Sequence, residues 1–159
     1  MRPEKKEARR LKIVEAASKL FLAQGFRATS LEEIAEEAGI GKATLYHYFE
    51  GKNALLGSVV SMYYNSFIQS LRTALGGAKD TKTKLLTYAR VLLRQHHRMT
   101  SSAGIHGTPN RELADRIMLH IRQKRQVELD IIRDILEAGV RAGCLRPSNI
   151  SLTAHLLLG

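Results

Sequence analysis

The chain has 159 residues, 44% of them hydrophobic, which is enough for a real core and excludes a disordered protein. It carries 25 Lys and Arg against 15 Asp and Glu, and the net charge of +10 favours a polyanionic partner such as nucleic acid. With three prolines and abundant helix formers the composition predicts an all-α fold, and the single cysteine excludes an internal disulfide.

Other classes of site also lack support in the sequence. A single cysteine excludes a multi-cysteine zinc site, and the six histidines include no His-x-x-x-His pair, so we expect neither a metal nor another cofactor. No apolar run approaches the ~20 residues that span a bilayer, and the charged N-terminus has no signal-peptide segment behind it. We therefore expect a cytoplasmic protein without a membrane partner.

The first predicted helix carries one apolar stripe and ends at Gly25. The stripe comprises Ile13, Ala16, Ala17, Leu20 and Phe21. Ser30 and Glu33 then form a Ser-x-x-Glu capping box, which opens a short second helix. Gly39 closes that helix, because glycine accepts the positive φ of a left-handed cap at little cost.

Residues 39–49, GIGKATLYHYF, contain a Gly-Lys pair that raises the question of a phosphate-binding loop. A Walker-type loop needs Ser or Thr after the lysine and a glycine five residues before the second glycine, but Ala43 and Glu36 occupy these positions. Because the linker after the second helix is only a few residues long, the next helix must turn sharply, as in a helix-turn-helix. The glycines are therefore interpreted as conformational.

The third predicted helix runs from about Lys42 to Phe49 and has two different sides. About 100° per residue places Leu45 and Phe49 toward the core. The opposite side is small and polar, with a phenol at each edge; it comprises Ala43, Thr44 and His47, flanked by Tyr46 and Tyr48. Such a face suits a DNA groove, with small groups near base edges and hydroxyls near phosphates.

Further helices are predicted over residues 52–75, 81–97 and 111–141, and a last one begins after Pro147, where Ser148 or Asn149 can cap it. The inward stripe of the 52–75 helix comprises Leu56, Val59, Tyr63, Phe67 and Leu71. We expect an N-terminal helix-turn-helix domain over residues 1–51 and a helical domain over 52–159.

The sequence RRLKIVEAASKLFLAQGFRATSLEEIAEEAGIGKATLYHYFEGKNALL, residues 9–56, resembles the DNA-binding domain of the tetracycline-repressor (TetR) family of bacterial regulators. The positions in family register are Gly25-Phe26, Thr29, Ile34-Ala35, Ala38-Gly39 and Thr44-Leu45-Tyr46-x-Tyr48-Phe49-x-x-Lys52. The resemblance covers about a third of the chain. It implies a homodimer whose recognition helices enter successive major grooves of an inverted-repeat operator, and which represses transcription until a small effector binds the C-terminal domain.

The resemblance also assigns expected roles to the N-terminal residues. It implies that Ser30 and Lys52 contact phosphates at the starts of their helices, and that Thr44, Tyr46 and Tyr48 touch phosphates or bases. Lys42 and His47 occupy the variable positions that tune sequence choice. With Ala43 on the outward face, the expected DNA-contact set is Ser30, Lys42, Ala43, Thr44, Tyr46, His47, Tyr48 and Lys52.

The C-terminal half offers candidates for an effector pocket, although the same residues could be plain core. They are Met62, Tyr63, Phe67, Tyr88, Leu92, His96, Met99, Ile117 and Ile121. A basic cluster raises the hypothesis of an anionic effector such as an acyl-CoA or a carboxylate, against the alternative of a solvated face. It comprises Arg90, Arg94, His96, His97 and Arg98, with His120, Arg122, Lys124 and Arg125.

The sequence also leaves two alternative functions to weigh and does not assign the dimer interface. The basic composition also permits an architectural DNA-binding protein without an effector. An enzyme using His96 and His97 is disfavoured, since no nucleophile with a spaced base accompanies them, and we expect no catalytic residues. The family's dimer interface uses the last two helices, and the chain ends within the first of them, so the C-terminal domain is expected to be incomplete or its interface unusual.

Overall fold

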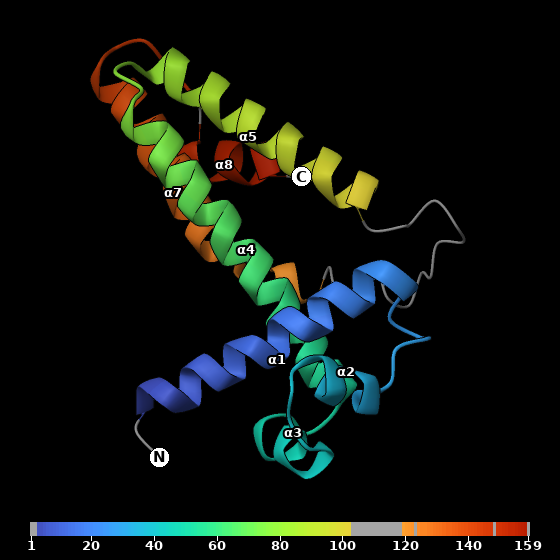
Figure 1. Ribbon diagram of the computed structural model, residues 1–159. Coiled ribbons are helices and arrows are strands. Elements are labelled where there is room, and N and C mark those ends of the chain that lie inside the picture. Colours follow the sequence, from blue (N-terminus) through green and yellow to red (C-terminus); the bar gives the residue numbers. More distant parts are fainter. Residues whose placement is uncertain (1–2, 103–118, 123, 148, 159) are drawn as a thin grey trace. The chain divides into compact units, whose positions relative to one another are not determined.

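The computed structural model describes residues 3–102, 119–122, 124–147 and 149–158, and this part of the chain is helical, without strands. The helices are α1 (Pro3–Gln24), α2 (Leu31–Glu37), α3 (Lys42–Tyr48), α4 (Lys52–Gly76), α5 (Thr81–Ser102), α7 (Gln126–Arg141) and α8 (Ile150–Leu158) (Figure 1). The predicted all-α fold is confirmed. Among these helices, none is long and apolar enough to cross a membrane.

The described residues form two compact units. The first takes in those within 1–63 and 98–120, and the second those within 64–97 and 121–159. The first unit therefore extends past the expected boundary at residue 51, because the opening turns of α4 supply Leu55 and Val59 to the N-terminal core. These turns position the recognition helix and belong with it.

The N-terminal elements begin and end where the sequence predicts. Gly25 ends α1 with a φ of 87°, and its amide donates to the Phe21 carbonyl at 3.1 Å. The Ser30–Glu33 capping box is present at the start of α2, and Gly39 follows α2 with a φ of 67°. The predicted stripe supplies the core: Ile13 and Ala17 are fully buried, and Ile34 and Leu45 join them from α2 and α3.

The second unit has its own core, built mainly by α4 and α7. Its buried members are Tyr64, Phe67, Ile68, Leu71, Tyr88, Leu129, Ile132, Leu136 and Ala154. Gly143, with a φ of 70°, follows α7, and the Asn149 side chain caps α8 by accepting from the Leu152 amide at 2.9 Å. The predicted single helix over 111–141 is wrong within the described residues, since Arg125 is a turn residue and α7 begins only after it.

Candidate nucleic-acid interface

The solvent-exposed side of α3 is built from positions one turn apart. Lys42, Ala43, Tyr46 and His47 are exposed, whereas Leu45 is fully buried and Phe49 is 4% exposed. Tyr46 is 48% exposed, so its ring stands in solvent. This face presents a cation, a methyl group, a phenol and an imidazole, and these four side chains are exposed among the described residues. These groups can donate to phosphates and approach base edges.

Two residues predicted for the same face lie elsewhere on the helix. Thr44 is half-buried, and Tyr48 packs against the core of the first unit, with its ring 5.8 Å from that of His47 in an edge-on arrangement. The Tyr48 hydroxyl is buried and has no hydrogen-bond partner among the described residues. Tyr48 therefore belongs to the buried edge of α3, while Tyr46 belongs to its open face.

Lys42 at the start of α3 is tied to α2 by an ion pair with Glu32. The hydrogen bond between them raises the pKa of Lys42 and lowers the pKa of Glu32, so both groups are charged at neutral pH. The ammonium also lies 5.9 Å from the centre of the Tyr46 ring. Both partners are exposed, and a phosphate can compete with the carboxylate for Lys42.

The Ser30 hydroxyl is occupied by the capping box. It accepts from the Glu33 amide at 3.1 Å and donates to Glu33 Oε2 at 2.8 Å, and the Ser30 amide donates to the same oxygen at 2.7 Å. These bonds lower the pKa of Glu33, since they favour its ionised form. The local geometry gives Ser30 a structural role at the start of α2.

Lys52 at the start of α4 reaches back to the loop between α1 and α2. Its ammonium donates to the Thr29 carbonyl at 2.8 Å and to the Arg27 carbonyl at 3.3 Å, and lies 4.6 Å from the centre of the Phe26 ring. Thr29 itself is 1% exposed and donates to the Gly25 carbonyl at 2.8 Å. All three contacts of the ammonium are made within the protein.

Arg10 of α1 also lies in this region, although it is not a member of the expected DNA-contact set. Its guanidinium donates to Ser58 Oγ at 2.9 Å and lies 5.1 Å from the centre of the Phe49 ring, at the C-terminal end of α3. Its place one turn before the apolar stripe, at Ile13, puts Arg10 on the core side of α1. That spacing was the signal that could have found it.

The described residues predicted to line an effector pocket are divided between the two units. Met62 packs against the core of the first unit, and the Tyr63 hydroxyl lies 2.7 Å from Ser18 Oγ. In the second unit, Phe67 and Tyr88 are core residues, and Ile121 packs on them. Leu92 is 37% exposed. The side chains of His96 and Met99, together with Ile117, lie outside the described residues.

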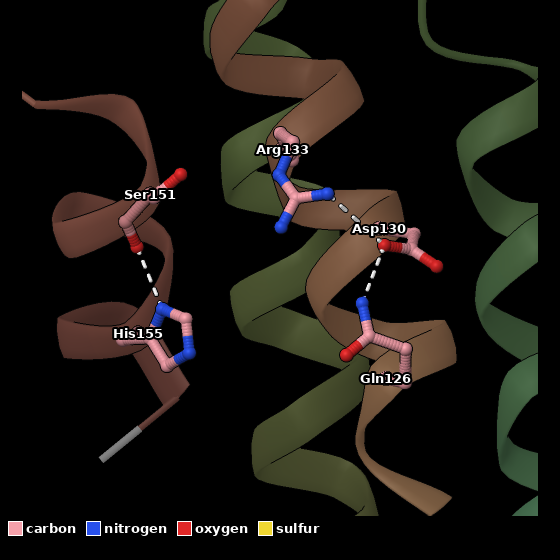
Figure 2. A network of polar contacts seen from close by, with 5 residues as sticks. All are labelled: Gln126, Asp130, Arg133, Ser151 and His155. Carbon is pink, nitrogen blue, oxygen red and sulfur yellow. Dashed lines mark hydrogen bonds and ion pairs between the residues drawn. The ribbon is translucent and has the colours of Figure 1, made fainter.

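The second unit contains a groove of about 500 Å³ between α4, α5 and α7. Its lining residues are Arg72, Leu75, Gly76, Lys84, Val127, Asp130, Ile131, Asp134 and Ile135, none of which was predicted for an effector pocket. On α7, Asp130 accepts from Gln126 at 2.8 Å and from Arg133 at 3.3 Å (Figure 2). Figure 2 also shows a separate contact on α8, between the His155 ring and the Ser151 carbonyl, which is not part of the groove lining. The short-range bonds of Asp130 fix the polar edge of the groove.

Among the described residues of the second unit, Glu128 is a buried carboxyl group. Glu128 is 5% exposed, and Tyr88 donates its hydroxyl to Glu128 Oε1 at 2.8 Å. Burial raises the pKa of Glu128, against the opposing effects of the Tyr88 hydrogen bond and the Arg125 charge. Burial likewise raises the pKa of Tyr64 to about 12, and its hydroxyl donates to the Lys124 carbonyl at 2.8 Å. In the part of the chain that the structure describes, no group of three potential metal ligands comes together.

Comparison with known proteins identifies the N-terminal region. Residues 13–59 match the family model described as "Bacterial regulatory proteins, tetR family". The HTH-type transcriptional regulator YhgD of Bacillus subtilis is 26% identical over 149 residues, covering 92% of this chain and 76% of YhgD. The HTH-type transcriptional repressor KstR2 of Rhodococcus jostii is 24% identical over 142 residues, covering 89% of this chain and 70% of KstR2.

A solved structure extends the likeness of fold beyond the matched region. The transcriptional regulator FadR from Bacillus subtilis, in complex with stearoyl-CoA, superposes with a TM-score of 0.64 at 22% identity, covering 94% of this chain and 81% of that chain. The N-terminal region of the chain therefore carries a DNA-binding domain of the TetR family of bacterial transcriptional regulators.

Proposed function

We propose that this protein is a sequence-specific repressor that binds an inverted-repeat operator as a homodimer and leaves it when an anionic effector binds. The observation that carries the DNA-binding part is the open face of α3, where Lys42, Ala43, Tyr46 and His47 lie exposed. A helix of this kind, held by a second helix across a short turn, fits the major groove. In a dimer, the two recognition helices would sit about 34 Å apart, one turn of DNA.

The contacts are divided between phosphates and bases by the chemistry of each side chain. The Tyr46 hydroxyl and the Lys42 ammonium suit phosphate oxygens, while the Ala43 methyl and the His47 ring suit base edges. Thr44 is half-buried and adds a hydroxyl next to Ala43 at the edge of the face. Ser30 and Lys52 would support this surface from within the protein, as their hydrogen bonds describe. Tyr48 contributes to DNA contact only if its buried hydroxyl turns outward.

An anionic effector is supported by the charge of the second unit and by the relatives. Arg90, Arg94 and Arg122 are exposed and have no carboxylate partner among the described residues. The FadR structure contains stearoyl-CoA, a polyanionic thioester with a long apolar chain. KstR2, whose name marks it as a repressor, supports the sign of regulation. We therefore take a long-chain acyl-CoA as the first probe and effector-induced release as the direction of response.

Selection of bound sites from a random duplex pool, at near-physiological salt, tests the DNA-binding proposal. We expect an enriched inverted repeat with half-sites about one turn apart. Tyr46→Phe should weaken binding to that site by about 1 kcal/mol, the usual net contribution of one hydrogen bond. The matched control is Tyr63→Phe, because Tyr63 is also exposed but its hydroxyl bonds Ser18. Salt-sensitive binding without an enriched sequence would instead favour an architectural DNA-binding protein.

The effector proposal has its own assay. Release of the operator duplex would be measured with stearoyl-CoA, with free CoA and with methyl stearate. Free CoA has the anionic group of stearoyl-CoA without its chain, and methyl stearate has the chain without the anionic group. We expect release by stearoyl-CoA alone. Tighter binding of the operator in its presence would overturn the repressor mechanism, and equal release by methyl stearate would overturn the requirement for an anion.

A further inference from the structure

The first part of α1 extends beyond the core that the rest of the helix packs on. α1 begins at Pro3, but its first buried residue is Ile13, and residues 4–9 are all exposed. At 1.5 Å per residue, the ten residues before Ile13 amount to about 15 Å of helix without a core beneath it. Proline is well tolerated at the first position of a helix, so the sequence supports a helical start there. Figure 1 shows this end of α1 projecting past α2 and α3.

Charges are segregated around this extension. With about 100° per residue, Lys5, Lys6, Arg9 and Arg10 fall within a sector of about 140°, and the carboxylates of Glu4 and Glu7 fall outside it, on the other side of the helix. The same sector, continued along the helix, contains the core residues Ile13 and Ala17. The cations therefore occupy the side of α1 that packs on the other helices further along, and Lys5, Lys6 and Arg9 lie there at exposed positions.

Arg10 locates this cationic sector relative to α3. Its guanidinium donates to Ser58 Oγ at 2.9 Å and lies 5.1 Å from the Phe49 ring, and Phe49 is the C-cap of α3. Arg9 and Lys6 lie within about one turn of Arg10, and Lys5 lies about 7.5 Å from it along the axis. The exposed cations thus begin beside the C-terminal end of the recognition helix and continue away from it.

The exposed cations have no partner in the part of the chain that the structure describes. Arg10 is bonded to Ser58 and lies 3.7 Å from Glu7, but Lys5, Lys6 and Arg9 make no ion pair or hydrogen bond with another described side chain. Three unpaired cations within two turns repel one another, and a polyanion would relieve that repulsion. Lysine and arginine heads without fixed geometry suit phosphate oxygens rather than base edges, which require positioned donors.

We propose that Lys5, Lys6 and Arg9 form a second DNA-contact surface, the α1 basic face, which binds backbone phosphates flanking the base pairs contacted by α3. The proposal rests on the proposed DNA-binding function and extends it. The α1 basic face adds affinity without sequence preference and lengthens the protected stretch of duplex at its outer edges. Arg10 takes no part in it, because its guanidinium holds α1 against α3 and α4.

The test is a salt titration of duplex binding with a triple variant, Lys5→Gln, Lys6→Gln and Arg9→Gln. Glutamine matches lysine and arginine closely in helix propensity, so α1 is retained. The matched control is Lys79→Gln, Lys82→Gln and Arg146→Gln, which removes the same charge from exposed positions of the second unit whose side chains have no ion-pair partner among the described residues. Fluorescence anisotropy on both the selected operator and a random duplex gives the slope of log affinity against log salt, and circular dichroism with thermal melting checks the fold.

We expect the slope to fall in magnitude by about 2.7 per bound protomer in the α1 variant, because each phosphate that the protein no longer neutralises reduces it by ~0.9, and by much less in the control. The decrease in affinity should be equal on operator and random duplex, and hydroxyl-radical protection should shrink at the outer edges of the site. Equal slopes in the two variants would overturn the proposal. A decrease confined to duplexes with particular flanking sequences would also overturn it, since it would indicate base contacts. Failure to select any operator would instead refute sequence-specific recognition, and the random duplex would still report on the α1 basic face.

Discussion

Replacing Lys52 with methionine removes the ammonium that joins the start of α4 to the loop before α2. The change keeps an unbranched stem that can still lie on the Phe26 ring, but it deletes the donor to the carbonyls of Thr29 and Arg27. Both carbonyls belong to the residues that lead into the Ser30 cap. The substitution therefore tests whether Lys52 holds the helix-turn-helix together.

The expected cost follows from the geometry. The 2.8 Å bond to Thr29 has the length of a good charge-assisted hydrogen bond, about 1.5 kcal/mol or more in net terms. The 3.3 Å bond to Arg27 is longer and weaker, and a cation at 4.6 Å from a ring centre adds about 0.5–1 kcal/mol in a half-exposed place. Ordering a lysine side chain opposes these gains by up to ~2 kcal/mol. We expect Lys52→Met to lower the free energy of unfolding by about 1–2 kcal/mol.

Chemical unfolding, followed by circular dichroism, would measure this decrease, with Lys82→Met as the matched control at an exposed position without an ion-pair partner among the described residues. The resemblance to the family implies the opposite role, a phosphate contact at the start of α4. A phosphate contact predicts unchanged stability and a salt slope of DNA binding smaller by ~0.9. Unchanged stability together with that smaller slope would refute the argument for an internal role of Lys52.

Three further substitutions test other parts of the structure. Ser30→Ala should lower the free energy of unfolding by about 1 kcal/mol, because it removes the N-cap acceptor of α2, and urea unfolding should show it without a change in the salt slope of DNA binding. Gly139→Ala should destabilise the protein by about 1–3 kcal/mol, since a Cβ would lie 2.5 Å from Leu145 Cδ1 and 2.8 Å from Thr81 Cγ2. Gly143→Ala separates a steric clash from backbone strain in the same assay, because its cost comes from the φ of 70° and not from a clash. The raised pKa of Glu128 means that the protonated form is favoured on folding, so its contribution is fully present below the unfolded pKa and is lost as pH rises through the folded pKa. Glu128→Gln should therefore gain stability relative to the parent as pH rises from about 4 to about 8, and a constant difference between the two proteins across that range would contradict the effect of burial.

Local signals predicted the helix-turn-helix well, because each of its boundaries depends on residues within a few positions. The cap at Ser30 and the left-handed glycines at 25 and 39 act through backbone geometry that neighbouring residues determine. The stripe from Ile13 to Phe21 has a single helical period, so its buried side was unambiguous. The interruption at Arg125 was missed because no proline or glycine marks it, and the apolar pattern runs on through it.

Side-chain partners across elements were harder to predict than helices. Lys52 lies 23 residues from Thr29 in sequence, and Arg10 lies 48 residues from Ser58, so no periodicity within one helix relates them. Assignment by position in a family gave Lys52 an external role, while the structure gives its ammonium three internal contacts. The described members of the predicted effector set are divided between two cores for the same reason, since an apolar stripe identifies a buried side but not which core it joins.

Tyr46 and Tyr48 are equivalent in the sequence-based prediction, but the structure gives them different environments. A helical wheel places both phenols at the edges of one outward face, about 200° apart around α3. In the structure the face is centred on Lys42, Ala43, Tyr46 and His47, which moves Tyr46 into its middle and turns Tyr48 toward the core. The difference comes from Tyr48, which packs against the core of the first unit and so extends the buried side of the short helix beyond Leu45 and Phe49. A hydroxyl on Tyr46 is therefore free to bond DNA, whereas the Tyr48 hydroxyl is desolvated without a partner among the described residues, at a usual cost of about 1–3 kcal/mol. Tyr48→Phe removes that cost and should stabilise the first unit, while Tyr46→Phe leaves stability unchanged and weakens only DNA binding.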